Sequence, residues 1–200
     1  VTDHIGDPAD GVADDTERRR RGLWYNNQRN DIVAGVMRRL PDSEQKLILV
    51  DTIHHAVELH RRLKGCNFSL AYDSIELQRE ARLKSKGLLP EDQPKMTPAY
   101  KEHLRLKFES GDGNFIATGT WAVGIDPTHL QHVCLASAAS GEIYATQAPG
   151  RVSRTNTDGK SVGHVHDFTD GFNDTLRNGP KKRSWVYERL GWSQVVIEHS

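Results

Sequence analysis

The sequence predicts a single α/β domain with three layers, in which helices cover both faces of a parallel β-sheet. Two observations support this fold class. Short apolar runs recur along the chain, and segments with helical spacing of apolar residues separate them. The run at 47–50 (LILV) is apolar throughout, which indicates a strand buried on both faces. A length of 200 residues suits one domain with room for an insertion or a tail.

The first half of the chain alternates helices and strands. Pro41 ends the first helical pattern, and Asp51 and Thr52 can cap the next helix, which Gly65 closes. The segment at 87–98 breaks the periodicity with three prolines and is predicted to be an inserted loop. The expected elements in this half are helix 24–40, strand 47–50, helix 53–65, strand 68–72 and helix 74–86.

The second half continues the same alternation, and the sequence GDG at 111–113 closes its first helix. The expected elements are helix 100–109, strand 114–118, strand 132–137, helix 142–147 and strand 161–168. In parallel sheets, ligands bind beyond the carboxyl ends of the strands. The most unusual residues of the sequence follow the strands at 114–118 and 132–137, so we expect the functional site there.

Residues 1–22 differ in composition from the rest. Six acidic residues and little apolar content precede the arginine run 18–21. We interpret 1–22 as an acidic and basic linker or arm, and 23–200 as the folded domain. The arginines could touch phosphates, although a solvated charge run is the commoner use of such a segment.

The overall charge excludes binding of nucleic acid by bulk attraction. Twenty-seven basic residues balance twenty-seven acidic ones, and the formal net charge is zero. Any nucleic-acid contact must therefore be local. Cys66 and Cys134 are too few for a disulfide framework or a zinc site. No apolar stretch approaches the ~18 residues of a membrane span, and the N-terminus is no signal peptide. We expect an intracellular protein, cytoplasmic or nucleoid-associated, with no membrane partner.

Two polar clusters follow the strands. The first is the turn ATGTWAVGIDP at 117–127, in which glycines allow close backbone approach and hydroxyls and amides can bind phosphate oxygens. The second is QAPGRVSR at 147–154. Arg151 and Arg154 are three residues apart and share a helical face, which suits a polyphosphate. Either cluster alone is weak evidence, since surface ion pairs would equally explain two arginines at this spacing.

The order of these clusters resembles motifs V and VI of superfamily 2 helicases, and LILVDTIHHAVELHRRL at 47–63 looks like motif IV of the same lobe. The resemblance covers about residues 24–192 and is nearest to DNA helicases related to XPB and to phage annealing helicases. It implies a RecA-like fold and the role of the second, C-terminal lobe. The family often has arginine directly after the motif VI glutamine, whereas this sequence has Ala148.

The resemblance also implies roles for individual residues. Arg151 and Arg154 would act as arginine fingers on ATP, and Gln147 would lie near its terminal phosphate. Gly124 and Asp126 would help to close the nucleotide cleft. A further set would contact nucleic acid, and it consists of Thr118, Gly119 and Trp121.

The resemblance implies ATP with Mg²⁺ as the cofactor, held mainly by an N-terminal RecA-like lobe, because this chain has no phosphate-binding loop of the usual kind. The sequence Gly159-Lys160-Ser161 lacks the glycine that such a loop has five residues earlier, where Arg154 stands instead. We therefore expect the chain alone to be inactive. It would bind nucleic acid, with DNA favoured over RNA, and the lobes would close on ATP.

Several alternatives remain open from the residues. His164 and His166 share one face of a strand, but no further ligand is evident by spacing, so no metal site is predicted. His54 and His55 could lie near the nucleic-acid groove, although surface positions at a helix start are the commoner interpretation. The chain could also be a binding module that hydrolyses nothing, or a different α/β nucleotide-binding protein in which QAPGRVSR is coincidental.

Overall fold

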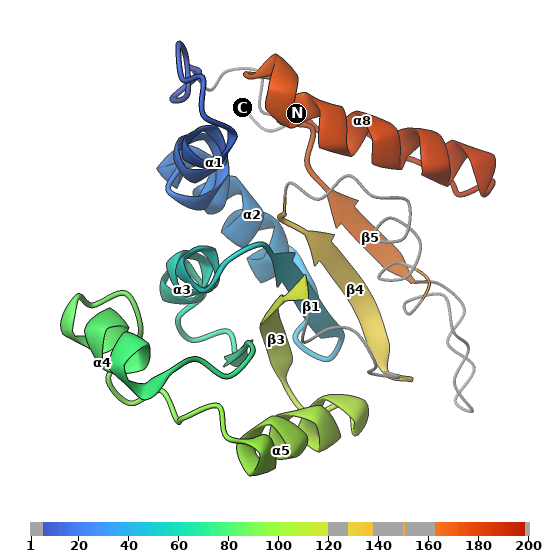
Figure 1. The fold of residues 1–200 in the computed structure, drawn as a ribbon. Helices are drawn as coiled ribbons and strands as arrows, with labels where there is room; N and C mark the ends of the chain where they lie inside the picture. Colours follow the sequence, from blue (N-terminus) through green and yellow to red (C-terminus); the bar gives the residue numbers. More distant parts are fainter. Residues whose placement is uncertain (1–5, 120–127, 138–149, 151–162, 199–200) are drawn as a thin grey trace.

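The computed structural model describes residues 6–119, 128–137, 150 and 163–198. Five parallel strands form one sheet in the order β2-β3-β1-β4-β5 (Figure 1). The strands are β1 (Gln45–Val50), β2 (Phe68–Ala71), β3 (Asn114–Thr118), β4 (Leu130–Leu135) and β5 (His164–Asp167). The predicted α/β class with a parallel sheet is confirmed.

Helices connect and flank these strands. They are α1 (Asp15–Arg19), α2 (Asn27–Arg39), α3 (Ile53–Arg62), α4 (Leu77–Ser85), α5 (Pro98–Glu109) and α8 (Asp174–Arg189), with a π-helical turn η1 at Arg20–Trp24. From β1 to β2 the chain moves two positions along the sheet through α3. From β2 to β3 it moves one position back through α5. Since such crossovers are right-handed, opposite directions place α3 and α5 on opposite faces. Helices therefore cover both faces, as predicted.

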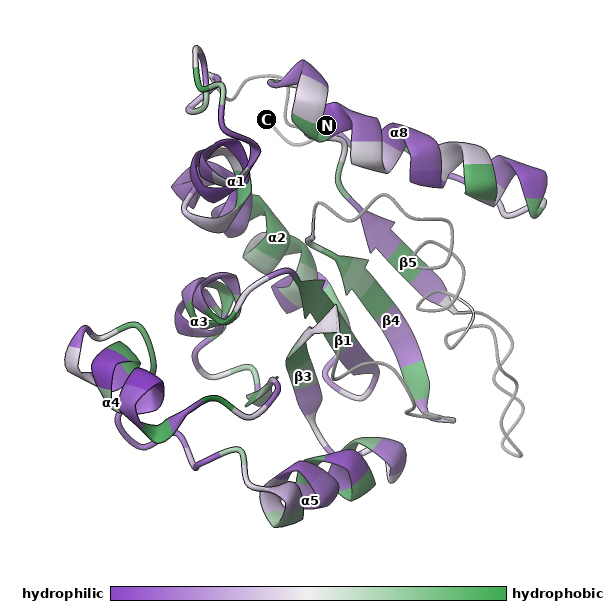
Figure 2. Cartoon of the chain, in the orientation of Figure 1, coloured by the Kyte–Doolittle hydropathy of each residue, from purple (hydrophilic) through white to green (hydrophobic). Residues whose placement is uncertain are grey.

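The core lies on the central strands. All six residues of β1 are buried, which agrees with its apolar run between two neighbouring strands. Hydrophobic colour concentrates on β1, the upper part of β4 and α2, whereas α8 is mostly hydrophilic (Figure 2). Phe108 of α5 meets Phe115 of β3 edge to face, with ring centroids 5.0 Å apart, which fixes that helix on the sheet.

Local capping explains where the helices begin. Asn26, Thr52, Thr97 and Asn173 each accept a hydrogen bond from a backbone N–H of the following first turn. Thr52 caps α3 as predicted. Pro98 occupies the first position of α5, where its missing N–H costs nothing.

Two segments differ in character from their sequence-based interpretation. Residues within the predicted arm form α1 and contact the domain, because Asn173 donates a 2.8 Å hydrogen bond to the Asp7 carboxylate and Ala9 is buried. The boundary between 22 and 23 stays a prediction. The inserted loop at 87–98 forms no helix or strand before Pro98, but Leu89 and Met96 are buried in the core. Among the described residues, no helix is long and apolar enough to cross a membrane.

The helix α8 is absent from the sequence-based expectations, and Gly179 and Pro180 in its middle explain why. Both residues are buried, and the helix continues through them for sixteen residues in total. Leu176, Val186 and Tyr187 are buried with them, so tertiary packing outweighs the low helix propensity of the Gly-Pro pair.

Candidate functional site

The carboxyl ends of the strands meet at one edge of the sheet. Thr118, the last residue of β3, is in register with Val50, the last residue of β1. On the other side of β1, Ala136 follows β4 and donates its N–H to the carbonyl of Leu49 at 3.0 Å. Since all strands are parallel, the segments after β3, β1 and β4 leave the sheet side by side. This edge is the expected place for a ligand.

Thr118 is the first partly exposed residue of β3, because the four residues before it are all buried. Gly119 is also partly exposed. These two residues are the predicted nucleic-acid contacts that the structure describes, and they lie at the edge where the sequence placed them. The remaining predicted site residues, namely Trp121, Gly124, Asp126, Gln147, Arg151 and Arg154, lie outside the described residues.

The turn after β1 lies next to Thr118, and two hydrogen bonds fix its conformation. The Trp24 indole N–H donates to the Asp51 carboxylate at 3.4 Å, and Thr52 Oγ1 accepts from the backbone N–H of His55 at 3.2 Å. These two bonds join η1, β1 and the start of α3. They hold the polar turn 51–52 at the carboxyl edge.

His55 is fully buried, which corrects the interpretation of a surface residue at a helix start. Its Nε2 lies 3.1 Å from Asn30 Oδ1, while the Asn30 side-chain N–H group donates to the Trp24 carbonyl at 3.1 Å. Because the Asn30 oxygen accepts, Nε2 of His55 has the proton. Burial, with further contributions from Arg29 and Arg62, holds the pKa of His55 well below its usual value. His55 is therefore a neutral structural residue. His54 is partly exposed, and burial lowers its pKa too.

A buried ion pair lies beneath the same edge, and sequence reasoning missed it. Arg29 of α2 donates to both carboxylate oxygens of Asp170, at 2.5 and 3.1 Å, and to the Ala136 carbonyl at 3.1 Å. Both side chains are almost fully buried. Arg29 also lies over the ring of Phe168, 5.7 Å from its centroid. This bidentate contact ties α2 to the segments that follow β4 and β5.

A sequence signal for Arg29 existed. It lies four residues before Val33 and eight before Met37, on the apolar face of α2, where an unpaired arginine would be too costly. Asp170 gave no such signal, because 141 positions separate it from its partner.

The histidines lie at the opposite, amino-terminal edge of the sheet. His132 lies in the first half of β4, and it is paired in register with His164 on β5. His132 Nε2 lies 2.6 Å from Glu44, and its Nδ1 lies 3.1 Å from His166 Nε2. Since the carboxylate can only accept, His132 has its proton on Nε2, and His166 donates to Nδ1. Within the described ranges, no group of His, Cys, Asp or Glu side chains could hold a metal ion.

Comparisons with known proteins identify the fold. No protein family matches the sequence, and no curated protein matches it. The C-terminal domain of the DEAD-box protein Dbp5 superimposes with a TM-score of 0.54 at 16% identity, covering 84% of this chain and 82% of that domain. T4 UvsW superimposes with a TM-score of 0.50 at 18% identity, covering 82% of this chain and 33% of UvsW.

A third similar structure is the ATP-dependent Type ISP restriction-modification enzyme LlaBIII bound to DNA. Its TM-score is 0.50 at 14% identity, covering 81% of this chain and 11% of that enzyme. The chain thus has the RecA-like α/β fold of helicase C-terminal domains, as predicted. The nearness to XPB-related and phage annealing helicases stays a prediction, because Dbp5 and UvsW superimpose about equally well.

Proposed function

We propose that this chain is the second RecA-like lobe of an ATP-dependent nucleic-acid helicase or translocase. One observation supports this most strongly. The parallel register brings Thr118, at the start of the motif V-like segment, beside Val50, which ends the motif IV-like strand. In the sequence, only the resemblance to helicase motifs linked these two segments to one site. Their meeting at the carboxyl edge, in a fold that superimposes on 82% of the Dbp5 C-terminal domain, supports a common site.

The proposed roles follow the resemblance. Arg151 and Arg154 would meet the phosphates of ATP, with Gln147 beside the terminal phosphate, while Gly124 and Asp126 would border the cleft. Two guanidinium groups can stabilise the negative charge that spreads over phosphate oxygens during transfer. Another lobe would hold most of the ATP and the Mg²⁺. This proposal includes nucleic acid as the partner and makes no choice between DNA and RNA.

Thr118 and Gly119 would contact a backbone phosphate. The Thr118 side chain is partly exposed at the end of a strand whose other residues are buried, so its position is fixed by the sheet. A hydroxyl on a rigid strand end can hold a phosphate oxygen without adding charge. Binding of nucleic acid would therefore depend on the position of the strand end more than on bulk attraction. This agrees with a formal net charge of zero.

ATP hydrolysis tests the assignment. We expect the 200-residue chain to show no ATPase activity alone, and to support nucleic-acid-stimulated activity in an assembly with a lobe that has a phosphate-binding loop. In that assembly, Arg151→Ala or Arg154→Ala should lower kcat by about 10³-fold, the lower end of the effect known for arginine fingers. Replacing the exposed Arg39 by alanine is the matched control and should leave kcat unchanged.

Two results would contradict the proposal. Activity of the chain by itself would require a complete phosphate site that the proposal denies. Full activity of both arginine variants would favour the alternative function, a RecA-like module that binds nucleic acid and contributes nothing to hydrolysis.

A further inference from the structure

The exposed face of α8 presents a row of basic and aromatic side chains. Arg177, Lys181, Trp185 and Arg189 follow one another at intervals of four residues, so they lie along one side of the helix. All four are exposed, while the buried residues of α8 face the sheet. We call these four residues the α8 stripe. From its first to its last residue the stripe is about 18 Å long, at ~1.5 Å per helical residue.

The positive charge of the stripe is only partly neutralised. Arg177 forms an ion pair with Asp174. Within the part of the chain that the structure describes, Lys181 and its neighbour Lys182 have no ion-pair partner. On α5, by contrast, Arg105 bridges two glutamates of its own helix. In a chain of zero formal net charge, the α8 stripe is therefore a local cationic surface.

Trp185 gives this surface an aromatic platform. Trp185 is 57% exposed, so its indole ring is accessible to a ligand at the surface. Arg189 lies with its guanidinium carbon 4.9 Å from the centre of the Trp185 ring. This contact steadies the ring and keeps a cation beside it.

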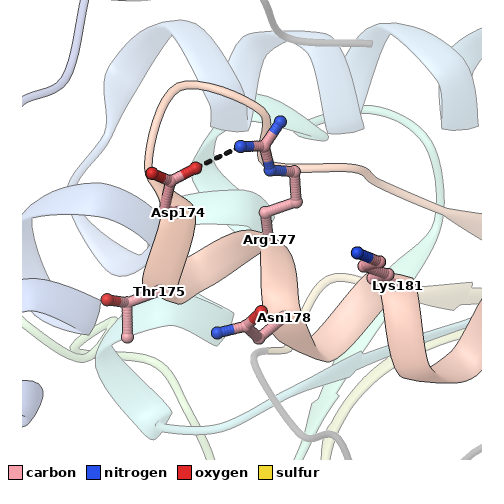
Figure 3. A pocket seen from close by; sticks show the side chains of 5 residues that line it. All are labelled: Asp174, Thr175, Arg177, Asn178 and Lys181. Carbon is pink, nitrogen blue, oxygen red and sulfur yellow. Dashed lines mark hydrogen bonds and ion pairs between the residues drawn. The ribbon is translucent and has the colours of Figure 1, made fainter.

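A hollow marks the first half of the stripe. Its volume is about 560 Å³, and Figure 3 shows the side chains that line it, with Arg177 turned toward Asp174 and Lys181 one turn further along. Among the described residues, its lining side chains are polar or charged, namely Asp174, Thr175, Arg177, Asn178 and Lys181. Hydrogen-bond donors with net positive charge in a polar hollow suit an oxyanion such as a phosphodiester.

We propose that the α8 stripe binds a single strand of nucleic acid, with phosphates on Arg177 and Lys181 and a base stacked on Trp185. An unpaired base can reach an exposed indole, whereas a base within a duplex cannot. The length of the stripe matches about five phosphates at the ~3.4 Å spacing of one stacked strand. This site is separate from Thr118, since α8 packs beside the edge strand β5 and β3 lies on the far side of β1 and β4. The choice of nucleic acid as the occupant rests on the proposed function.

The test measures binding of the 200-residue chain to a fluorescein-labelled 20-nucleotide oligo-dT by fluorescence anisotropy, over a series of salt concentrations. Arg177→Glu with Lys181→Glu should weaken binding at least tenfold and reduce the slope of log affinity against log salt by about 1.4, for two lost phosphate contacts. Trp185→Ala should weaken binding at least fivefold with the slope unchanged. Lys64→Glu with Lys95→Glu is the matched control, because both lysines are exposed and lie on other parts of the surface.

The outcomes separate this inference from the proposed function. Equal losses in the two double variants would show a general charge effect and overturn the stripe. If Thr118→Val weakens binding and the stripe variants do not, the stripe fails while the proposed grip stands. Binding of poly-glutamate or anionic vesicles through the stripe, with none of oligo-dT, would also overturn the choice of nucleic acid. Circular dichroism melts of each variant exclude unfolding as the cause of a loss.

Discussion

At the scale of single residues, the buried ion pair between Arg29 and Asp170 holds α2 beneath the carboxyl edge of the sheet. Both groups are desolvated, so each depends on the other for compensation of its charge. We expect Arg29→Met to lower the free energy of unfolding by about 3–5 kcal/mol, because Asp170 remains buried without its partner. Urea unfolding measures this change.

The double variant Arg29→Met with Asp170→Leu is the informative control for that prediction. Removing both charges removes the uncompensated group, so much of the lost stability should return. Arg39→Met, on the exposed side of the same helix, should change stability by less than about 0.5 kcal/mol. A double variant no more stable than Arg29→Met would show that the arginine acts through packing instead.

The pKa values of the histidines at the amino-terminal edge of the sheet allow a prediction of how stability depends on pH. Burial, and then the charges of His132 and His164, lower the pKa of His166 from 6.5 to about 4. The unfolded chain binds a proton near pH 6.5, whereas the folded protein does not until near pH 4. Stability is therefore full above about pH 6.5 and falls as the pH drops toward 4, by up to roughly 3 kcal/mol for this group.

Unfolding measured at several pH values tests this dependence. His166→Gln should reduce the slope between pH 6.5 and 4, while replacing the exposed His103 by glutamine should leave the slope as it is. His132 and His55, whose pKa values burial also lowers, contribute in the same direction and keep part of the slope in every variant. An unchanged slope in His166→Gln would contradict the assignment.

At the scale of elements, η1 and α8 pack closely against each other at Gly22. A Cβ atom at this position would lie 2.3 Å from Leu176 Cδ1, and Leu176 is buried, so the Leu176 side chain or one of the two elements must shift. We expect Gly22→Ala to destabilise the protein by about 1–3 kcal/mol. Thermal unfolding measures the effect.

Gly35 offers the matched control. It lies inside α2, and the nearest atom to its added Cβ would be the flexible end of Arg39, 3.7 Å away. Gly35→Ala should therefore raise stability by roughly 0.5–1 kcal/mol through helix propensity alone. If both alanine variants behaved alike, close packing of η1 against α8 would not explain the glycine at position 22.

Elements differ in how far the sequence predicted them, and the reasons are physical. The strand β3 has the predicted bounds, because an apolar run enclosed by glycines leaves little choice. The helix α8 was not predicted, since Gly179 and Pro180 suggest a break that burial overrides. At the candidate site, the resemblance to motif V singled out Thr118, which lies at the end of β3, and its role stays a prediction. The Arg29–Asp170 pair depends on a contact between distant segments, which the sequence does not show.

At the scale of the whole molecule, the net charge and the strand order together constrain how the proposed binding could occur. The formal net charge is zero, so long-range attraction would add little and the proposed binding of a strand would depend on specific contacts. The proposed contacts come from two regions of the molecule. Thr118 lies on β3, and the α8 stripe lies on the helix beside β5. A chain that binds through two separated regions gains affinity from each, provided that one strand can reach both.

The hydroxyl of Thr118 can be tested within this arrangement without disturbing the fold. Thr118→Val keeps the β-branched shape that suits a strand end and removes only the group proposed to meet a phosphate. We expect affinity for a labelled oligonucleotide to fall on the order of tenfold, the loss of one hydrogen bond to a charged group. Because no charge is removed, the salt slope should stay the same, unlike that of the stripe variants. Thr16→Val, on the exposed helix α1, should leave affinity unchanged. Unchanged affinity in Thr118→Val would mean that the strand end supports the fold and contacts no phosphate through its hydroxyl.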